Sequence, residues 1–197
     1  MKALTRTKSQ IQKARGLIEE LENSPDLKSF RDNWDRFLTQ LERCYSHSLS
    51  ELSKSPKFNG WNVRGHVEQK RKKDPLLSYM VNARGAADHT VAEITEHVKG
   101  GLDVFILPKD DSGVTRIDHM SFDGEGNVSI KCNKPLAIQR YPDFVELLPV
   151  VNRGRKYEVP NMHLGRDLSQ LDPVDLATLA LDYYEDYIKK AESHFVK

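Results

Sequence analysis

Cysteine is scarce in this chain, which has only Cys44 and Cys132 among its 197 residues. The two lie far apart and form no CxxC pair, so the sequence supports neither a disulfide framework nor a zinc knuckle. Two reduced thiols in a reducing compartment are the expected state.

Long apolar runs are also missing. No stretch approaches the roughly 18 apolar residues that a membrane-spanning helix needs. The basic N-terminal segment, MKALTRTKSQIQKARG, has no apolar core and no small-residue cleavage site, so it is unlike a secretory signal. These absences predict a soluble, cytoplasmic protein that makes no use of a membrane.

Several motifs of nucleotide and hydrolase chemistry are absent. The sequence contains no GxxxxGK[ST] loop, no GxGxxG fingerprint and no GxSxG elbow. The acidic segment 123–127 is too short for a calcium-binding loop and is typical of a hairpin turn. No cofactor is predicted. With 30 Lys and Arg against 29 Asp and Glu, any preference for nucleic acid must come from local patches.

What is present is enough apolar material for a core, at 38% of residues, under a highly charged surface. Apolar residues recur at steps of three and four in several segments, which predicts helices. Asp-Pro pairs at 74–75 and 172–173 provide a cap followed by proline at the first helical position. The expected helices span residues 3–23, 26–53, 74–98 and 172–195.

Residues 102–159 have a different character, with short β-branched runs separated by turn signals. We expect four to six strands there, with a hairpin around 123–127. The predicted fold class is therefore α+β, a long-helix bundle with an inserted small, mostly antiparallel β-sheet. The expected parts are residues 1–100, an inserted β-rich part at 101–160, and a loop and final helix at 161–197 that complete the bundle.

The first candidate site is the pair Arg84 and His89 in the third long helix. Histidine suits proton transfer from a ribose 2′-hydroxyl near neutral pH, and a guanidinium suits the charge that gathers on a phosphate. Five helical residues turn through about 500°, which leaves a net offset of about 140°, so the two side chains would point in different directions. A distorted helix or a site shared between two protomers would resolve this.

The R-x4-H pattern on a bundle helix resembles the HEPN superfamily, many of whose members are ribonucleases of toxin–antitoxin, defence and RNA-processing systems. The resemblance implies a homodimer, metal-independent RNA cleavage that leaves a cyclic phosphate, and catalysis by Arg84 and His89. It also implies a bacterial stress or defence role, with an antitoxin or another protein as partner. The residue after the arginine is usually polar in the family and is Gly85 here.

A basic stretch precedes this helix and provides the predicted RNA-binding residues. They are Arg64 and the consecutive cations Lys70, Arg71, Lys72 and Lys73. Such a run can hold a phosphate backbone, and it can also be a solvated helix end.

Other patterns leave alternatives open. His89, Glu93 and His97 follow one another at steps of four, but ordinary pairing on a helix surface is the better interpretation, and no metal site is predicted. His163, Gly165 and Arg166 lie in a loop that either lines a cleft or simply connects two elements. The competing function is a non-catalytic interaction module, with the bundle as a dimerisation scaffold and the β-rich part as the partner-binding surface.

Overall fold

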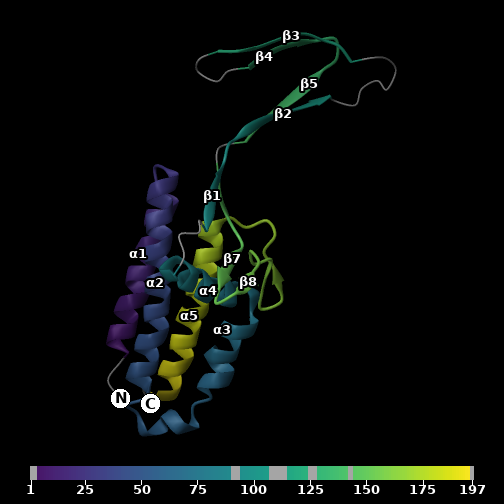
Figure 1. Cartoon of the computed structure of the whole chain (residues 1–197). Coiled ribbons are helices and arrows are strands. Elements are labelled where there is room, and N and C mark those ends of the chain that lie inside the picture. Colours follow the sequence, from purple (N-terminus) through teal and green to yellow (C-terminus); the bar gives the residue numbers. More distant parts are fainter. Residues whose placement is uncertain (1–3, 90–93, 107–114, 124–127, 142–143, 196–197) are drawn as a thin grey trace. The chain divides into compact units, whose positions relative to one another are not determined.

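The computed structural model describes residues 4–89, 94–106, 115–123, 128–141 and 144–195 (Figure 1). The helices are α1 (Thr5–Glu22), α2 (Leu27–Leu52), α3 (Gln69–Lys73), α4 (Pro75–His89) and α5 (Pro173–Phe195), with a 3-10 turn, η1 (Pro56–Gly60), and a π-helical turn, η2 (Arg64–Glu68). The strands are β1 (Thr95–Val98), β2 (Gly101–Ile106), β3 (Ile117–Phe122), β4 (Val128–Cys132), β5 (Leu136–Tyr141), β6 (Phe144–Leu147), β7 (Val150–Asn152), β8 (Arg155–Tyr157), β9 (Met162–His163) and β10 (Arg166–Asp167).

The α+β class is confirmed, and so are the predicted caps at Asp74 and Asp172. Asp26 accepts a hydrogen bond from the Ser29 amide at 2.7 Å at the start of α2. Asp74 accepts one from Leu77 at the start of α4, and Asp172 accepts one from Asp175 at the start of α5. Each carboxylate satisfies an amide that the first helical turn leaves without a partner.

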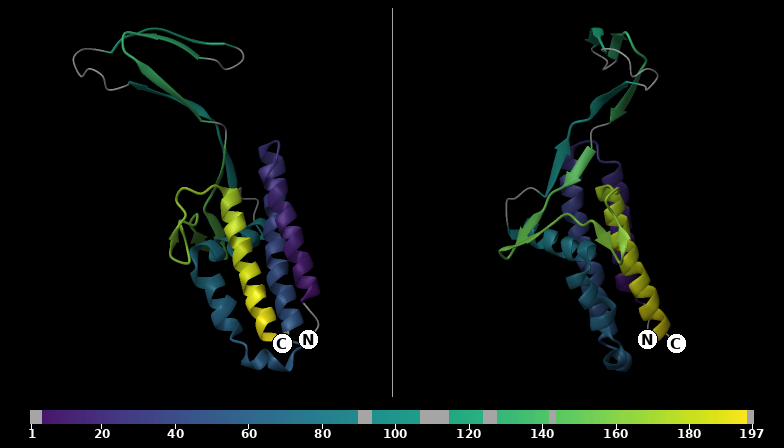
Figure 2. Two further views of the ribbon diagram at one scale, coloured as in Figure 1. Left: turned by 180° about the vertical axis from the view of Figure 1, so that it is seen from behind. Right: turned by 90° about the vertical axis from the view of Figure 1, so that its right-hand side faces the viewer.

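The long helices α1, α2 and α5 lie side by side and bury one apolar face each (Figures 1 and 2). Trp34 of α2 is fully buried, and its ring lies 6.1 Å from Phe30 and 5.9 Å from Phe37. On the surface, Arg15 of α1 reaches Glu185 of α5 at 2.5 Å. The strongest periodic signal in the sequence, that of residues 26–53, is therefore the core face of a bundle helix.

Helix α4 is shorter than expected. The prediction extended it to residue 98, but it ends at His89, and Thr95–Val98 form strand β1, which pairs with β6. Arg31 of α2 donates to the Thr95 carbonyl at 2.7 Å. Thr95 and Val98 are β-branched, which favours a strand, and a short apolar run does not distinguish the two states.

The strands are antiparallel, as expected, but among the described residues they form five separate two-stranded sheets instead of one larger sheet. The pairs are β1–β6, β2–β5, β3–β4, β7–β8 and β9–β10. The hairpin predicted around 123–127 is confirmed by the β3–β4 register. The segment 160–171, expected as a loop, contains the short β9–β10 hairpin.

The chain divides into two compact units. Residues 1–97 and 145–197 form the helical unit, and residues 98–144 form the β unit. In this division residues 145–160 belong to the helical unit, and strands β7 and β8 of that segment contact α4. Val150 is buried there, and the Tyr79 hydroxyl donates to the Leu148 carbonyl at 2.7 Å.

Candidate functional site: a basic groove beside helix α4

Two basic segments that are far apart in the sequence meet beside the start of α4. Lys72 and Lys73 end α3, and Arg155 and Lys156 belong to β8. Together these four cations line a groove of about 270 Å³, which we call the basic groove. The sequence predicted the first pair as RNA-binding residues and missed the second.

Local sequence explains why the two segments meet. Asp74 ends α3 and caps α4, so the lysines lie at the corner between the two helices. Strands β7 and β8 are joined by Arg153 and Gly154, whose φ angles of 52° and 74° fit the tight turn of a two-residue hairpin. Because Val150 of β7 is buried against the bundle, the hairpin holds β8 close to α4.

The electrostatics of the basic groove favour an anionic ligand. Among the described residues that line it, four are cations and one, Glu158, is an acid. Glu158 pairs with Lys156 at 2.8 Å. The other three cations leave the groove with a net charge of +3. Tyr157 lies under the Arg155 guanidinium, 5.3 Å from the ring centroid. Burial raises the pKa of Tyr79, so this lining residue stays neutral.

Arg71 has a different environment from its basic neighbours. Its side chain is only 10% exposed, and its guanidinium donates to Glu42 at 2.5 Å and to the Tyr184 hydroxyl. It also lies 3.9 Å over the Tyr45 ring. Its position inside the helical unit gives Arg71 a structural role and removes it from the surface on which RNA could lie.

The remaining predicted RNA-binding residues are placed as follows. Lys70 is exposed on α3. Arg64 begins η2, and its side chain is outside the described part of the structure. Of the five predicted residues, the structure therefore brings Lys72 and Lys73 into the basic groove.

Arg84 and His89 both lie on α4, which continues unbroken between them. Arg84 is half-buried, whereas the side chain of His89 is outside the described residues. Between them Gly85 faces β7, where a Cβ on the glycine would stand 2.5 Å from Asn152 Nδ2. Asn152 donates to Asn82 Oδ1 at 3.0 Å. Gly85 thus allows a polar side chain from β7 to approach the helix closely.

A buried Asp–His pair involves Asp74, the residue between Lys73 and Pro75 of the basic groove. His163 Nδ1 is 2.8 Å from Asp74 Oδ1, and the second carboxylate oxygen accepts from the Leu164 amide at 2.8 Å. Burial alone would raise the pKa of Asp74, but its hydrogen bonds from His163, Leu164 and Leu77 outweigh this and lower it. The ionised carboxylate only accepts hydrogen bonds, so His163 Nδ1 carries the proton.

His163, which was expected in a loop, lies in β9 and contacts the carboxylate of Asp74. His163 also borders a pocket of about 210 Å³ with His66 and Tyr183. The Tyr183 hydroxyl donates its hydrogen bond to the backbone carbonyl of His66 at 2.5 Å. The Asp-Pro signal identified Asp74 as a cap, but no sequence signal pointed to its partner, which lies 89 residues away.

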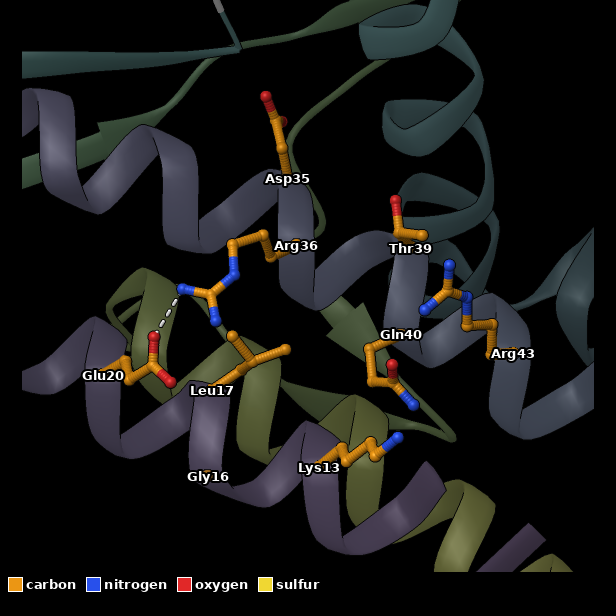
Figure 3. Close-up of a pocket in the computed structure, with 9 residues that line it drawn as sticks. All are labelled: Lys13, Gly16, Leu17, Glu20, Asp35, Arg36, Thr39, Gln40 and Arg43. Carbon is orange, nitrogen blue, oxygen red and sulfur yellow. Dashed lines mark hydrogen bonds and ion pairs between the residues drawn. The ribbon is translucent and has the colours of Figure 1, made fainter. Parts of the chain in front are cut away.

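A second groove, of about 640 Å³, lies between α1 and α2 (Figure 3). Figure 3 shows Lys13 on α1 and Arg36 and Arg43 on α2 around it. Arg36 is engaged by Glu20 at 2.6 Å and by Asn33 at 2.8 Å. Three cations and two acids line this groove, a net charge of +1 compared with +3 for the basic groove.

The possible metal pattern of His89, Glu93 and His97 is not preserved as a helical face. His97 lies in β1, and Glu93 is outside the described residues. Within the described ranges no three His, Cys, Asp or Glu side chains come together as metal ligands. None of the described helices is both long and apolar enough to cross a membrane.

In comparison with known proteins, no family model, curated protein or solved structure matches the chain. The HEPN resemblance therefore rests on the R-x4-H pattern and the helical bundle alone.

Proposed function

We propose that this protein binds RNA through the basic groove. The observation that carries the proposal is the convergence of Lys72 and Lys73 with Arg155 and Lys156 around one concavity. RNA affinity depends largely on phosphate neutralisation by Lys and Arg, and a chain with a net charge of +1 must concentrate its cations to achieve it. Tyr157 adds an aromatic ring at the site, suited to contact with a base.

The shape of the site supports a single strand over a flat anionic surface. The cations lie on both sides of a concavity, from α3 on one side and β8 on the other. A flexible strand can enter such a groove and contact both sides, whereas a planar surface would meet only its rim. Single-stranded segments are also the usual targets of RNA-binding proteins.

The finer proposal is metal-independent cleavage of the bound RNA by Arg84 and His89, in a cytoplasmic HEPN-like homodimer of a stress or defence system. In it His89 transfers the proton, and Arg84 stabilises the charge on the phosphorane. What supports it is that α4, which carries both residues, also begins at the basic groove. An antitoxin or another regulatory protein is the proposed partner.

The binding test compares fluorescence anisotropy of a labelled mixed-sequence RNA for three proteins. These are wild type, the groove variant Lys72→Ala/Lys73→Ala, and a control variant, Lys13→Ala/Arg43→Ala. The control removes two cations from the α1–α2 groove, so it changes net charge equally. We expect the groove variant to lose at least about tenfold in affinity. Its log–log salt slope should fall by roughly 1.4, or about 0.7 for each lost phosphate contact.

Two outcomes of this binding test would overturn the RNA-binding proposal. One is unchanged affinity in the groove variant, and the other is an equal loss in the control. Arg155→Ala/Lys156→Ala checks the opposite side of the groove in the same way.

Cleavage is tested separately, with wild type, Arg84→Ala and His89→Ala, each with and without EDTA. EDTA-resistant cleavage that both variants lose supports the nuclease. Binding without cleavage, or equal cleavage by all three proteins, removes Arg84 and His89 from the mechanism and leaves RNA binding as the function.

A further inference from the structure

The β3–β4 hairpin of the β unit separates apolar and polar side chains completely. The cross-strand partners on one face are Ile117 with Cys132, Met120 with Ile130, and Phe122 with Val128. The partners on the other face are His119 with Lys131 and Ser121 with Ser129. The register shift between Ile117 and His119 inserts Asp118 and keeps Ile117 on the first face, which we call the apolar face.

The apolar face is uncovered. Ile117, Met120 and Phe122 are 52%, 43% and 63% exposed, and no described residue between 98 and 144 is buried. Two-stranded hairpins are marginal in water unless a hydrophobic face packs against something else. Contiguous exposed apolar patches of this kind mark interaction surfaces.

Size favours a protein surface as the occupant. The six side chains expose apolar area on the order of 500 Å² for each copy, so two faces together reach about the 1,000 Å² that a specific interface requires. Nucleic acid is disfavoured, because residues 98–144 contain six Lys or Arg and seven Asp or Glu.

Charge along the hairpin favours a second copy as that occupant. The open end carries Arg116 and Lys134, with Asp118 paired to Arg116 at 2.7 Å. The other end carries Asp123, which directly follows the last residue of β3. If two hairpins stack face to face and antiparallel, the basic end of each lies against the acidic end of the other.

We propose that two copies of this chain associate through the apolar faces of their β3–β4 hairpins about a two-fold axis. Such an interface is isologous, because each patch meets its own copy. The apolar side chains provide the attraction, and the charged ends fix the antiparallel orientation. The proposal rests on the β3–β4 hairpin and stands or falls independently of RNA binding.

Sedimentation equilibrium of the full chain between about 1 and 100 µM tests this association. Wild type should form a dimer, and Phe122→Ser should raise the dimer dissociation constant at least tenfold. Val151→Ser is the matched control, since Val151 is 53% exposed but belongs to the helical unit. Circular dichroism should show the same helix content in all three proteins.

Orientation is tested by charge reversal. Asp123→Lys and Lys134→Glu should each weaken self-association, because each places like charges together at both ends of the dimer. A one-to-one mixture of the two variants should form a heterodimer with nearly wild-type affinity, since opposite charges then meet at both ends.

Three results would overturn the proposal. A wild-type monomer over the whole range would mean that another part of the chain or a different protein covers the apolar face. A dimer that Phe122→Ser leaves intact would use a different surface. A mixture of the charge variants that remains monomeric would exclude the antiparallel arrangement.

Discussion

Replacement of Arg71 by alanine should destabilise the helical unit by about 3 kcal/mol. Breaking a buried ion pair typically costs about 3–5 kcal/mol. Glu42 is 28% exposed and regains some hydration, which places the cost toward the lower end. The buried Tyr184 hydroxyl also loses its donor, and Tyr45 loses a stacked cation worth about 1 kcal/mol. These terms overlap and do not simply add.

Thermal unfolding followed by circular dichroism measures the effect. For a chain of this length the expected fall in Tm is about 6–12 °C. Arg71→Lys keeps the positive charge but loses the planar guanidinium and its stacking on Tyr45, so its Tm should lie between those of wild type and Arg71→Ala. Lys72→Ala, one position away, should remain within about 0.5 kcal/mol of wild type. The reasoning is refuted if Arg71→Ala has the Tm of wild type but loses as much RNA affinity as the groove variant Lys72→Ala/Lys73→Ala.

Four further predictions concern single sites. Gly16→Ala should stabilise α1 by about 0.5–1 kcal/mol, since open space surrounds the new Cβ. Gly85→Ala should not raise the free energy of unfolding in urea, because its Cβ would clash with the Asn152 side chain. In an Asn152→Ala background, where that side chain is absent, Gly85→Ala should stabilise the protein. The carboxylate of Asp74, whose pKa is lowered by folding, stabilises the protein above its ordinary pKa of 3.8. This contribution is lost as pH falls below that value, so wild type should lose more stability than Asp74→Asn in urea titrations at decreasing pH. Burial raises the pKa of the Cys44 thiol to about 12, so iodoacetamide at pH 8 should modify it only after unfolding, as mass spectrometry can show.

The sequence predicted those features whose causes are local. The long helices follow from apolar spacing, and the starts of α4 and α5 follow from Asp-Pro pairs. The β3–β4 hairpin follows from β-branched runs around a turn. The predicted end of α4 was wrong because Thr95–Val98 forms a strand by pairing with β6, which lies far along the chain.

The site was predictable only in part. A run of four cations says nothing about which side chain turns inward, and burial of Arg71 depends on partners in α2 and α5. Lys72 and Lys73 were identified by composition, but Arg155 and Lys156 become their neighbours only through packing of the β7–β8 hairpin on α4. Such long-range juxtapositions have no signature in a single sequence.

The discontinuity of the helical unit has a consequence for its synthesis. Helix α5 packs against α1 and α2, yet it follows them by more than a hundred residues. At about 5–20 residues per second, a ribosome needs about 5–20 s to pass from the end of α4 to the end of α5. During that interval the apolar faces of α1 and α2 lack their final neighbour. The nascent chain should therefore depend on chaperones until α5 emerges.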